Sequence, residues 1–311
     1  MNRVKRDKIP GAAIVLALAI VIFTIGSRNF LTLSNGLNII RQGTVLLLVS
    51  LGMGLAILSG GVDLSIGAVL GLSGVVAGII MRAGLGILAA VSASITVATF
   101  VGFINGFFVA RLRVPPFVAT FSTMSMAHGI ALVISKEGSV WGIDQRIRWV
   151  ADGYVLGIPM PLILAILASL VFWILMRYTS YGFGIYALGG NEEAALYAGV
   201  PVVAFRTLAY AVSGLITGIA SILLVARMNS ALPTAGSGYE WDAIAVAVVG
   251  GLIFGTGKGG VLGIVVGAAL ISVVRNGLNL LGVGVYLQVV VVGLIIVFAY
   301  VLEVLYRKKE R

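Results

Sequence analysis

Long apolar stretches separated by short polar segments run along the whole chain. A helix needs about 20 apolar residues to cross a bilayer core, whereas a barrel strand needs about 10 with alternating polarity. Because the stretches do not alternate, they predict an all-α integral membrane protein with about ten transmembrane helices. The predicted spans are residues 11–27, 42–59, 63–81, 86–110, 117–135, 159–176, 206–226, 241–256, 260–277 and 285–304.

The composition agrees with a surface that faces lipid. The chain is 60% hydrophobic and 10% charged, whereas a soluble domain carries about 25% charged residues. A net charge of +10 would suggest nucleic acid as the partner of a soluble protein. Here basic residues are expected in cytoplasmic loops and near anionic lipid, so we expect membrane lipid and no nucleic acid as a partner. With no cysteine and one histidine, we expect no metal or cofactor in the chain.

An even number of spans places both termini on one side of the membrane. If that side is the cytoplasm, thirteen of the 21 Lys and Arg residues lie in inner segments: Arg3, Lys5, Arg6, Lys8, Arg111, Arg113, Arg177, Arg206, Lys258, Arg307, Lys308, Lys309 and Arg311. This bias predicts that both termini are cytoplasmic. Apart from outer segments 136–158 and 227–240 and inner segment 177–205, the turns are tight. We therefore expect residues 1–311 to form a single transmembrane domain.

The inner segment contains signals for one short helix, at about residues 190–200. Asn191 is a typical N-cap and Gly199 a typical stop. Between them lie acidic residues suited to a helix N-terminus and then helix-favouring alanines: Glu192, Glu193, Ala194 and Ala195. Such a helix is far too short to span. Either it only covers the bundle, or it docks into a cytoplasmic partner, with small residues such as Gly189 and Gly190 allowing close approach.

Several polar residues within the spans permit two interpretations. They are Asn105, Thr120, Thr123, Asn276 and Asn279. Asparagine and threonine in membrane helices commonly bond to neighbouring helices or to their own backbone. The same groups would also suit a polar path for a solute, and the residues alone do not decide between the two roles.

Asp63 is a carboxylate beside apolar helices, which is energetically costly and by default suggests a functional role. It also comes just before Leu64 and Ser65, where it would cap the third predicted helix. We favour the structural cap over a gating role. The adjacent Gly60 and Gly61 indicate a helix break or close packing of the chain.

Four motifs resemble the permease subunits of bacterial ribose-type sugar ABC importers. They are Leu-Ser-Gly-Gly-Val-Asp-Leu-Ser-Ile-Gly at 58–67, Tyr-Gly-Phe-Gly-Ile-Tyr-Ala-Leu-Gly-Gly-Asn-Glu-Glu-Ala-Ala-Leu-Tyr-Ala-Gly-Val-Pro at 181–201, Ala-Arg-Met-Asn-Ser-Ala-Leu-Pro-Thr-Ala-Gly-Ser-Gly-Tyr-Glu-Trp-Asp-Ala-Ile-Ala at 226–245 and Arg-Asn-Gly-Leu-Asn-Leu-Leu-Gly at 275–282. They occur in the family's order, and the resemblance covers nearly the whole chain. Segment 136–158 is the part that least resembles the family.

The resemblance implies a non-catalytic permease that moves a monosaccharide such as ribose across the bacterial inner membrane. It implies a fold like that of the vitamin B12-type importers and a pair of permease chains. It also implies an extracytoplasmic sugar-binding protein and a cytoplasmic ATPase with two nucleotide sites, which binds ATP and Mg²⁺. The segment around 190–200 matches the family's coupling helix, so the implied ATPase-coupling residues are Gly189, Gly190, Asn191, Glu192, Glu193, Ala194, Ala195 and Gly199.

Other functions are less well supported by the residues. The cargo could instead be a branched-chain amino acid or another small polar solute, as in related permeases. An ion-coupled transporter normally has charged groups deep in its bundle, but only Asp63, Asp242 and Glu303 lie at or in predicted spans, all near helix ends. The G-x-G-x-x-G pattern at 255–260 lies between apolar helices and not after a strand, which argues against a dinucleotide site. An intramembrane enzyme would need a nucleophile with a base or a metal cluster.

Overall fold

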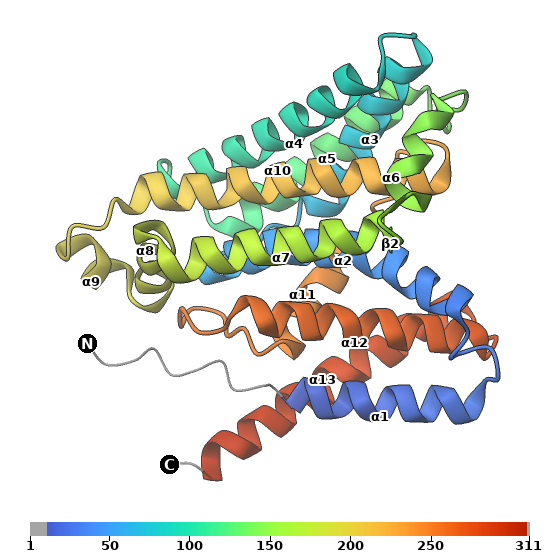
Figure 1. The fold of residues 1–311 in the computed structure, drawn as a ribbon. Coiled ribbons are helices and arrows are strands. Elements are labelled where there is room, and N and C mark those ends of the chain that lie inside the picture. The colour runs from blue at the N-terminus through green and yellow to red at the C-terminus, as the bar shows by residue number, and fades with distance from the viewer. Residues whose placement is uncertain (1–10, 310–311) are drawn as a thin grey trace.

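The computed structural model describes residues 11–309, without the side chains of 296 and 299–309. It is almost entirely helical (Figure 1). The described residues form thirteen α-helices: α1 (Gly11–Gly26), α2 (Leu33–Leu58), α3 (Ile66–Arg82), α4 (Ile87–Ala110), α5 (Pro116–Ser135), α6 (Trp149–Asp152), α7 (Met160–Tyr178), α8 (Ser180–Gly190), α9 (Glu192–Tyr197), α10 (Val202–Met228), α11 (Tyr239–Val249), α12 (Val261–Leu280) and α13 (Val285–Lys309). A 3₁₀ turn, Gln145–Arg148, precedes α6, and a two-stranded hairpin of β1 (Tyr154–Val155) and β2 (Ile158–Pro159) follows it.

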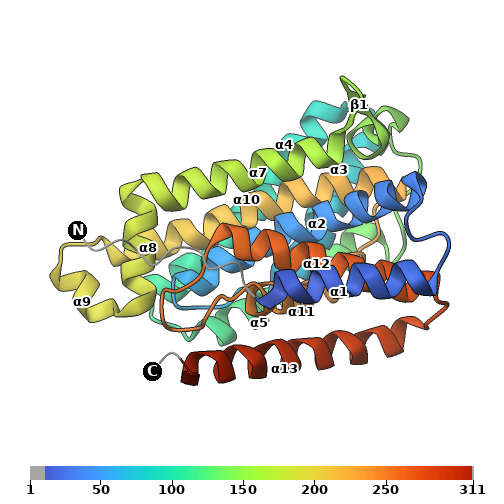
Figure 2. The same cartoon turned by 60° about the horizontal axis from the view of Figure 1, so that its bottom comes forward.

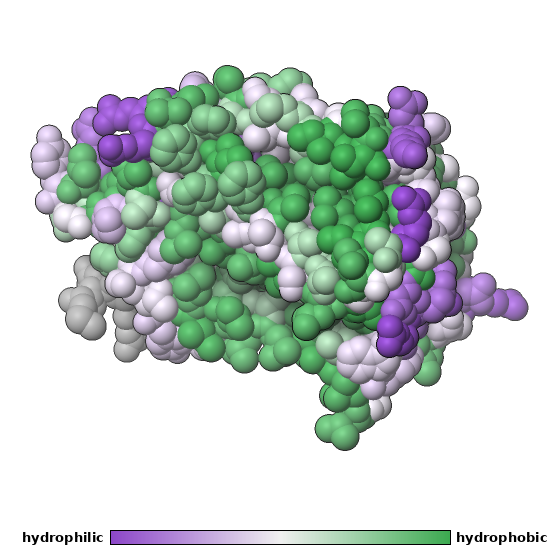
Figure 3. Space-filling model, turned by 90° about the horizontal axis from the view of Figure 1, so that it is seen from above, coloured by the Kyte–Doolittle hydropathy of each residue, from purple (hydrophilic) through white to green (hydrophobic). Residues whose placement is uncertain are grey.

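Six helices are long and apolar enough to cross a bilayer, namely α2, α4, α5, α7, α10 and α12. Shorter apolar helices are α1, α3 and the first part of α13. Side chains such as Leu88 and Val133 are 81% and 75% exposed on the outside of the bundle. Figure 3 shows a broad apolar surface between two hydrophilic ends. This distribution is that of a multi-pass membrane protein.

Nine of the ten predicted spans coincide with helices, but the eighth, 241–256, is wrong. Its helix, α11, has only 11 residues and ends at Val249. Gly250 and Gly251 follow, and Gly251 has φ of +81°, which a helix does not accept. At about 1.5 Å per residue, α11 is roughly half as long as the ~30 Å hydrocarbon core.

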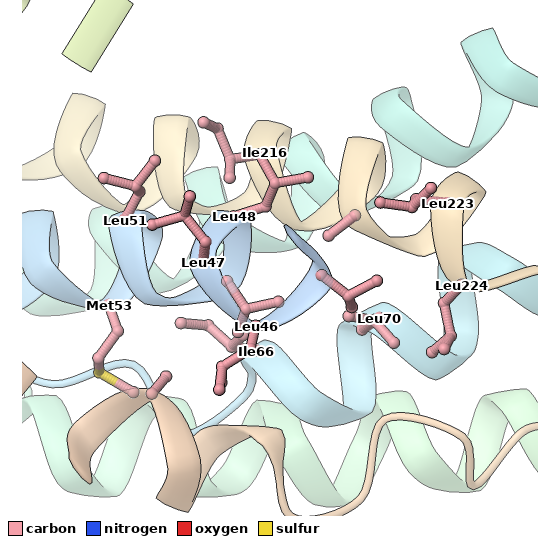
Figure 4. Packing of buried hydrophobic residues seen from close by; sticks show 14 of the residues in the cluster. Leu46, Leu47, Leu48, Leu51, Met53, Ile66, Leu70, Ile216, Leu223 and Leu224 are labelled. Carbon is pink, nitrogen blue, oxygen red and sulfur yellow. The ribbon is translucent and has the colours of Figure 1, made fainter. Parts of the chain in front are cut away.

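The hydrophobic core lies where α2 and α10 pack together. Leu47, Leu48 and Leu51 of α2 face Ile216 and Leu223 of α10 (Figure 4). On its other side α10 packs against α4 through glycines. A Cβ at Gly102 would clash with the Tyr210 carbonyl, and one at Gly214 would clash with the Ala98 carbonyl. Small residues thus bring these backbones into direct contact, as is usual between membrane helices.

The segment before α11 is folded into the bundle, so the predicted outer loop 227–240 is only partly a surface loop. Ala231 pairs with Val140 at the end of the molecule that carries α6. Residues 231–236 then run along α3, where a Cβ at Gly71 would clash with the Pro233 carbonyl and one at Gly67 with the Gly236 carbonyl. The glycine face of α3 therefore packs partly against a segment of successive turns and not against another helix.

The two ends of the bundle differ. α6 and the β-hairpin lie at one end, and α9 lies at the other (Figures 1 and 2). α1 begins and α13 ends toward the end that carries α9. α1, α12 and α13 pack together in a layer on the α2 side of the molecule.

Candidate functional site

A short helix protrudes from one end of the bundle, where the sequence predicts one. Asn191 Oδ1 accepts a hydrogen bond of 3.0 Å from the backbone N–H of Ala194, which caps α9 as expected. Gly199 follows the helix with φ of +82°, the left-handed conformation typical of a helix stop. Tyr197 is 90% exposed at the end of α9. The local prediction of a helix within 190–200 is thus confirmed.

Gly189 and Gly190 lie at the end of α8 and not at the start of α9. The sequence did not predict α8 as a separate helix, because its glycines and aromatic residues give no clear period. A Cβ at Gly189 would clash with the Leu58 carbonyl at the end of α2. The close approach that Gly189 permits is therefore made to the bundle itself.

The remaining residues of the predicted coupling set divide between two faces of α9. Ala195 is 3% exposed and packs with Leu188 and Val202, whereas Glu193 and Ala194 are exposed. Glu192 turns back toward α10, where its carboxylate forms two hydrogen bonds of 2.6 and 3.2 Å with the Arg206 guanidinium. That guanidinium holds the pKa of Glu192 below its usual value, and the positive charge of Arg113 adds to the effect.

Asp63 lies at the centre of a buried polar cluster that we call the polar junction, made of Asp63, Ser65, Asn105, Thr123 and Ser213. Asp63 Oδ1 accepts hydrogen bonds from the backbone and hydroxyl of Ser65, at 3.1 and 2.6 Å. Asp63 Oδ2 accepts one of 3.2 Å from Ser213 on α10. Helix α3 begins at Ile66 with Ser65 as its N-cap residue, so the expectation that Asp63 itself caps α3 is wrong. The helix starts later because the hydrogen bonds between Asp63 and Ser65 hold residues 63–65 in a turn before it.

Two of the predicted pathway residues belong to the polar junction, and a third adjoins it. Asn105 donates to the Ser65 hydroxyl at 2.8 Å, and Thr123 donates to Asn105. Thr120 donates to the Pro116 carbonyl at 2.8 Å, one turn earlier in its own helix. Asn105 and Thr120 are 0% exposed, and Thr123 is 5% exposed. In this conformation Asn105 and Thr123 connect the turn before α3 with α4 and α5, which favours an interhelical role over pathway lining.

The other two predicted pathway residues, Asn276 and Asn279, lie far from the polar junction along α12. Asn276 and Asn35 exchange two amide hydrogen bonds, at 2.8 and 2.9 Å, which join α12 to α2. Asn279 accepts a hydrogen bond of 2.7 Å from Gln288 on α13. The structure therefore divides the five predicted residues into two separate groups.

A group of charged residues at the start of α11 was not predicted as a site. Asp242 forms an ion pair with Arg275 of α12; the Asp242 side chain is largely buried and that of Arg275 is 33% exposed. Glu240 is 7% exposed, and its Oε1 accepts a hydrogen bond of 3.2 Å from the backbone N–H of Gly238. Buried charge in a membrane helix is the signal that could have found them. Asp242 was predicted at the end of a span, where a charged residue is common, and was therefore not interpreted as a buried charge.

Segment 136–158, at the opposite end from α9, is more ordered than a plain loop. Its charged residues form the ion pairs Asp144–Arg146 and Arg148–Asp152, and Asp152 also pairs with Arg41 of α2. Trp141 and Leu156 are 64% and 98% exposed. Its contact with residue 231 joins the two predicted outer segments into one surface.

The described residues do not place three or more histidine, aspartate or glutamate side chains together as metal ligands would be. What they do define is a multi-pass helical membrane protein with a short capped helix projecting from one end. A family model described as the permease component of branched-chain amino acid transport systems matches residues 35–300. The chain belongs to this family, and is therefore a non-catalytic permease subunit of a bacterial ABC importer, as its motifs predicted.

Individual relatives extend over nearly the same length. The chain is 38% identical to a ribose import permease from Bacillus subtilis, over 96% of this chain and 93% of the relative. It is 38% identical to a D-allose transport permease from Escherichia coli, over 96% and 92%. It is 33% identical to an L-arabinose transport permease from Escherichia coli, over 97% and 92%. No solved structure matches the chain.

Proposed function

We propose that this permease imports a monosaccharide such as ribose. The observation that carries the proposal is that relatives named for ribose, allose and arabinose transport are 33–38% identical to nearly the whole chain. The aligned region covers the membrane helices that must form any translocation path, so the similarity concerns the residues of that path as well as the fold.

In this proposal, two copies of the chain pair in the membrane in a fold like that of the vitamin B12-type importers. Each copy crosses the membrane ten times, and both termini are cytoplasmic. The eighth crossing consists of the turns at residues 231–236 followed by α11, because α11 alone is too short. The even number of crossings fits the position of the start of α1 and the end of α13 toward the same end as α9 (Figure 2).

The projecting helix α9 docks on a cytoplasmic ATPase, which binds ATP and Mg²⁺ at two nucleotide sites. The exposed face of α9, with Glu193, Ala194 and Tyr197, makes this contact. Asn191 and Gly199 set the ends of the helix, whereas Gly189, Gly190 and Ala195 fit it to the bundle. A sugar-binding protein docks at the other end, on segment 136–158 and the surface part of 227–240.

The sugar passes through the membrane by alternating access, with weak binding on the way. Asn105, Thr120, Thr123, Asn276 and Asn279 contact it only in conformations in which the helices around them separate, because this conformation buries or pairs them. Asp63 then acts as a gate residue, since opening that region must break its hydrogen bonds.

A branched-chain amino acid is the second candidate cargo, favoured by the description of the family model. Both candidates use the same machinery, so only a transport measurement separates them. We would reconstitute the chain with its ATPase and binding protein in liposomes. We would then measure ATP-driven uptake of labelled ribose, allose, arabinose and leucine. Uptake of one sugar with no uptake of leucine is expected, and uptake of leucine alone would contradict the proposal.

A further inference from the structure

Arg206, near the start of α10, contacts two different parts of the chain at once. Its Nη1 and Nη2 atoms bond to the Glu192 carboxylate of α9, at 3.2 and 2.6 Å. Its Nε donates a hydrogen bond of 3.2 Å to the backbone carbonyl of Ser59. The Arg206 side chain is only 13% exposed. A planar guanidinium can make these bonds together, whereas a lysine ammonium is a single point charge.

The Ser59 carbonyl marks the place where the chain leaves α2. Ser59 is the C-cap residue of α2 and is fully buried. Carbonyls at a helix C-terminus lack partners within the helix, so a bond from a side chain fixes where the helix ends. Gly60 follows with φ of +89°, a conformation that favours glycine. The Arg206 side chain thus holds the start of the break between α2 and α3.

The same face of α10 holds the rest of this break. Tyr210 donates a hydrogen bond of 3.2 Å to the Val62 carbonyl, and Ser213 donates to Asp63 at the polar junction. Positions 206, 210 and 213 have the i, i+4, i+7 spacing that puts side chains on one face of a helix. Residues 59–63 are therefore attached to α10 at three successive points.

α9 contacts this face through one ion pair at its beginning and through the packing of Ala195 against Val202. Among the described residues, α9 forms one ion pair with the rest of the bundle, that of Glu192 with Arg206, and buries one side chain, that of Ala195. The ion pair is thus the polar contact that links α9 to the same side chain that holds Ser59.

We propose that Arg206 is a positioning residue that ties α9 to the helix break at residues 59–63, so that a movement of α9 is passed to the polar junction. This inference rests on the proposed contact between α9 and the ATPase. When the ATPase displaces α9, Glu192 pulls or releases the guanidinium, which shifts α10 relative to the end of α2. Without Arg206, α9 can move while residues 59–63 stay in place.

The test uses the complete importer in liposomes and measures sugar taken up per ATP hydrolysed. We expect Arg206→Ala to keep the ATPase bound and hydrolysis running, but to lower this ratio on the order of tenfold, since charge-assisted bonds of this strength are lost. Arg206→Lys should give an intermediate ratio, because one ammonium cannot make all the contacts. Arg111→Ala, an exposed arginine after α4, is the control and should couple like the wild type.

Charge exchange distinguishes a coupling role from a merely structural one. Glu192→Arg combined with Arg206→Glu restores an ion pair but leaves no donor for the Ser59 carbonyl. We expect this double variant to regain thermal stability while the uptake ratio stays low. A ratio restored to the wild-type value would overturn the proposal, because the ion pair alone would then suffice.

The remaining outcomes are also decisive. If Arg206→Ala does not assemble, Glu192→Gln decides, since it breaks the ion pair and leaves the bond from Arg206 to Ser59. Suppose that wild-type uptake depends on ATP and the binding protein. If the uptake ratio is then unchanged in Arg206→Ala, or in Glu192→Gln where Arg206→Ala does not assemble, this inference is overturned and the proposed function is not. If wild-type uptake needs neither ATP nor the binding protein, the proposed function is contradicted, and this inference with it.

Discussion

Several buried polar side chains among the described residues form hydrogen bonds to other segments, or within the turn before α3. Asp63 accepts three hydrogen bonds, from two residues on two segments. Asn276 and Asn35 satisfy each other across α12 and α2. An unpaired polar group in the membrane interior costs free energy because no water replaces the lost partner. These bonds therefore specify which helices are neighbours.

Asp63 can be tested by separating its charge from its hydrogen bonds. Asp63→Ala leaves the Ser65 and Ser213 donors buried without an acceptor, which costs about 1–3 kcal/mol for each donor. Asp63→Asn keeps one oxygen for Ser65 and offers an amide to the Ser213 hydroxyl. We expect a clear fall of the melting temperature in detergent for the alanine variant and a small one for the asparagine variant. Equal falls would mean that the charge, and not the hydrogen bonds, is what matters.

The Glu192–Arg206 pair predicts a pH dependence at α9. The pKa of Glu192 is lowered in the folded protein by the guanidinium, so the unfolded state binds the proton more readily. The pair therefore contributes stability above the ordinary glutamate pKa, and loses it as the pH falls through the lower, folded value. In a carbon NMR titration of the carboxyl, we expect the Glu192 midpoint to lie below 4.5, the usual value, and to rise in Arg206→Ala. A midpoint that does not respond to this substitution would contradict the pair.

Two kinds of element pack in the bundle: full-length helices and short pieces that end inside it. The α4–α10 contact depends on glycines, as already described for Gly102 and Gly214. The short helix α11 packs on α12 in the same way, because a Cβ at Gly267 of α12 would clash with the Val246 carbonyl of α11. Packing of backbone against backbone fixes the distance between elements more strictly than packing of flexible side chains does.

Glycine substitutions measure how strict this packing is. In Gly214→Ala the new methyl group meets the Ala98 carbonyl, and overpacking of this kind costs about 1–3 kcal/mol. Gly129 is the matched control, because it also lies in a helix but a Cβ there has no neighbour within 4 Å. We expect Gly214→Ala to lower the melting temperature and Gly129→Ala to leave it unchanged or raise it slightly. Equal effects would show that α4 and α10 are not in close contact.

At the scale of the whole molecule, the apolar pattern was sufficient for the class of protein and for the position of nine helices, of which six are long and apolar enough to cross a bilayer. It failed at 241–256, because an apolar run does not show that its helix ends at Val249. It failed at 227–240, because the packing of residues 231–236 against α3 is a contact between segments far apart in the chain. Local signals at Asn191 and Gly199 predicted α9 correctly, since caps act over a few residues.

The contacts of the candidate site could not be predicted in the same way. Arg206 was counted only as a positive charge retained on the inner side, and its partners Glu192 and Ser59 are 14 and 147 residues away in the chain. The polar junction likewise joins residues from α4, α5, α10 and the turn before α3. Contacts over such distances depend on helix packing, which a single sequence does not reveal.

The most direct test of the account is transport by this chain, co-purified with its ATPase and placed in liposomes, with and without a sugar-binding protein. Wild type is compared with a variant in which Glu192 and Glu193 are both changed to arginine, which reverses the charge at the start of α9. We predict that wild-type uptake requires ATP and the binding protein, and that the folded double variant has lost it. If uptake follows a proton or sodium gradient without ATP, or if the double variant transports like the wild type, the account is contradicted.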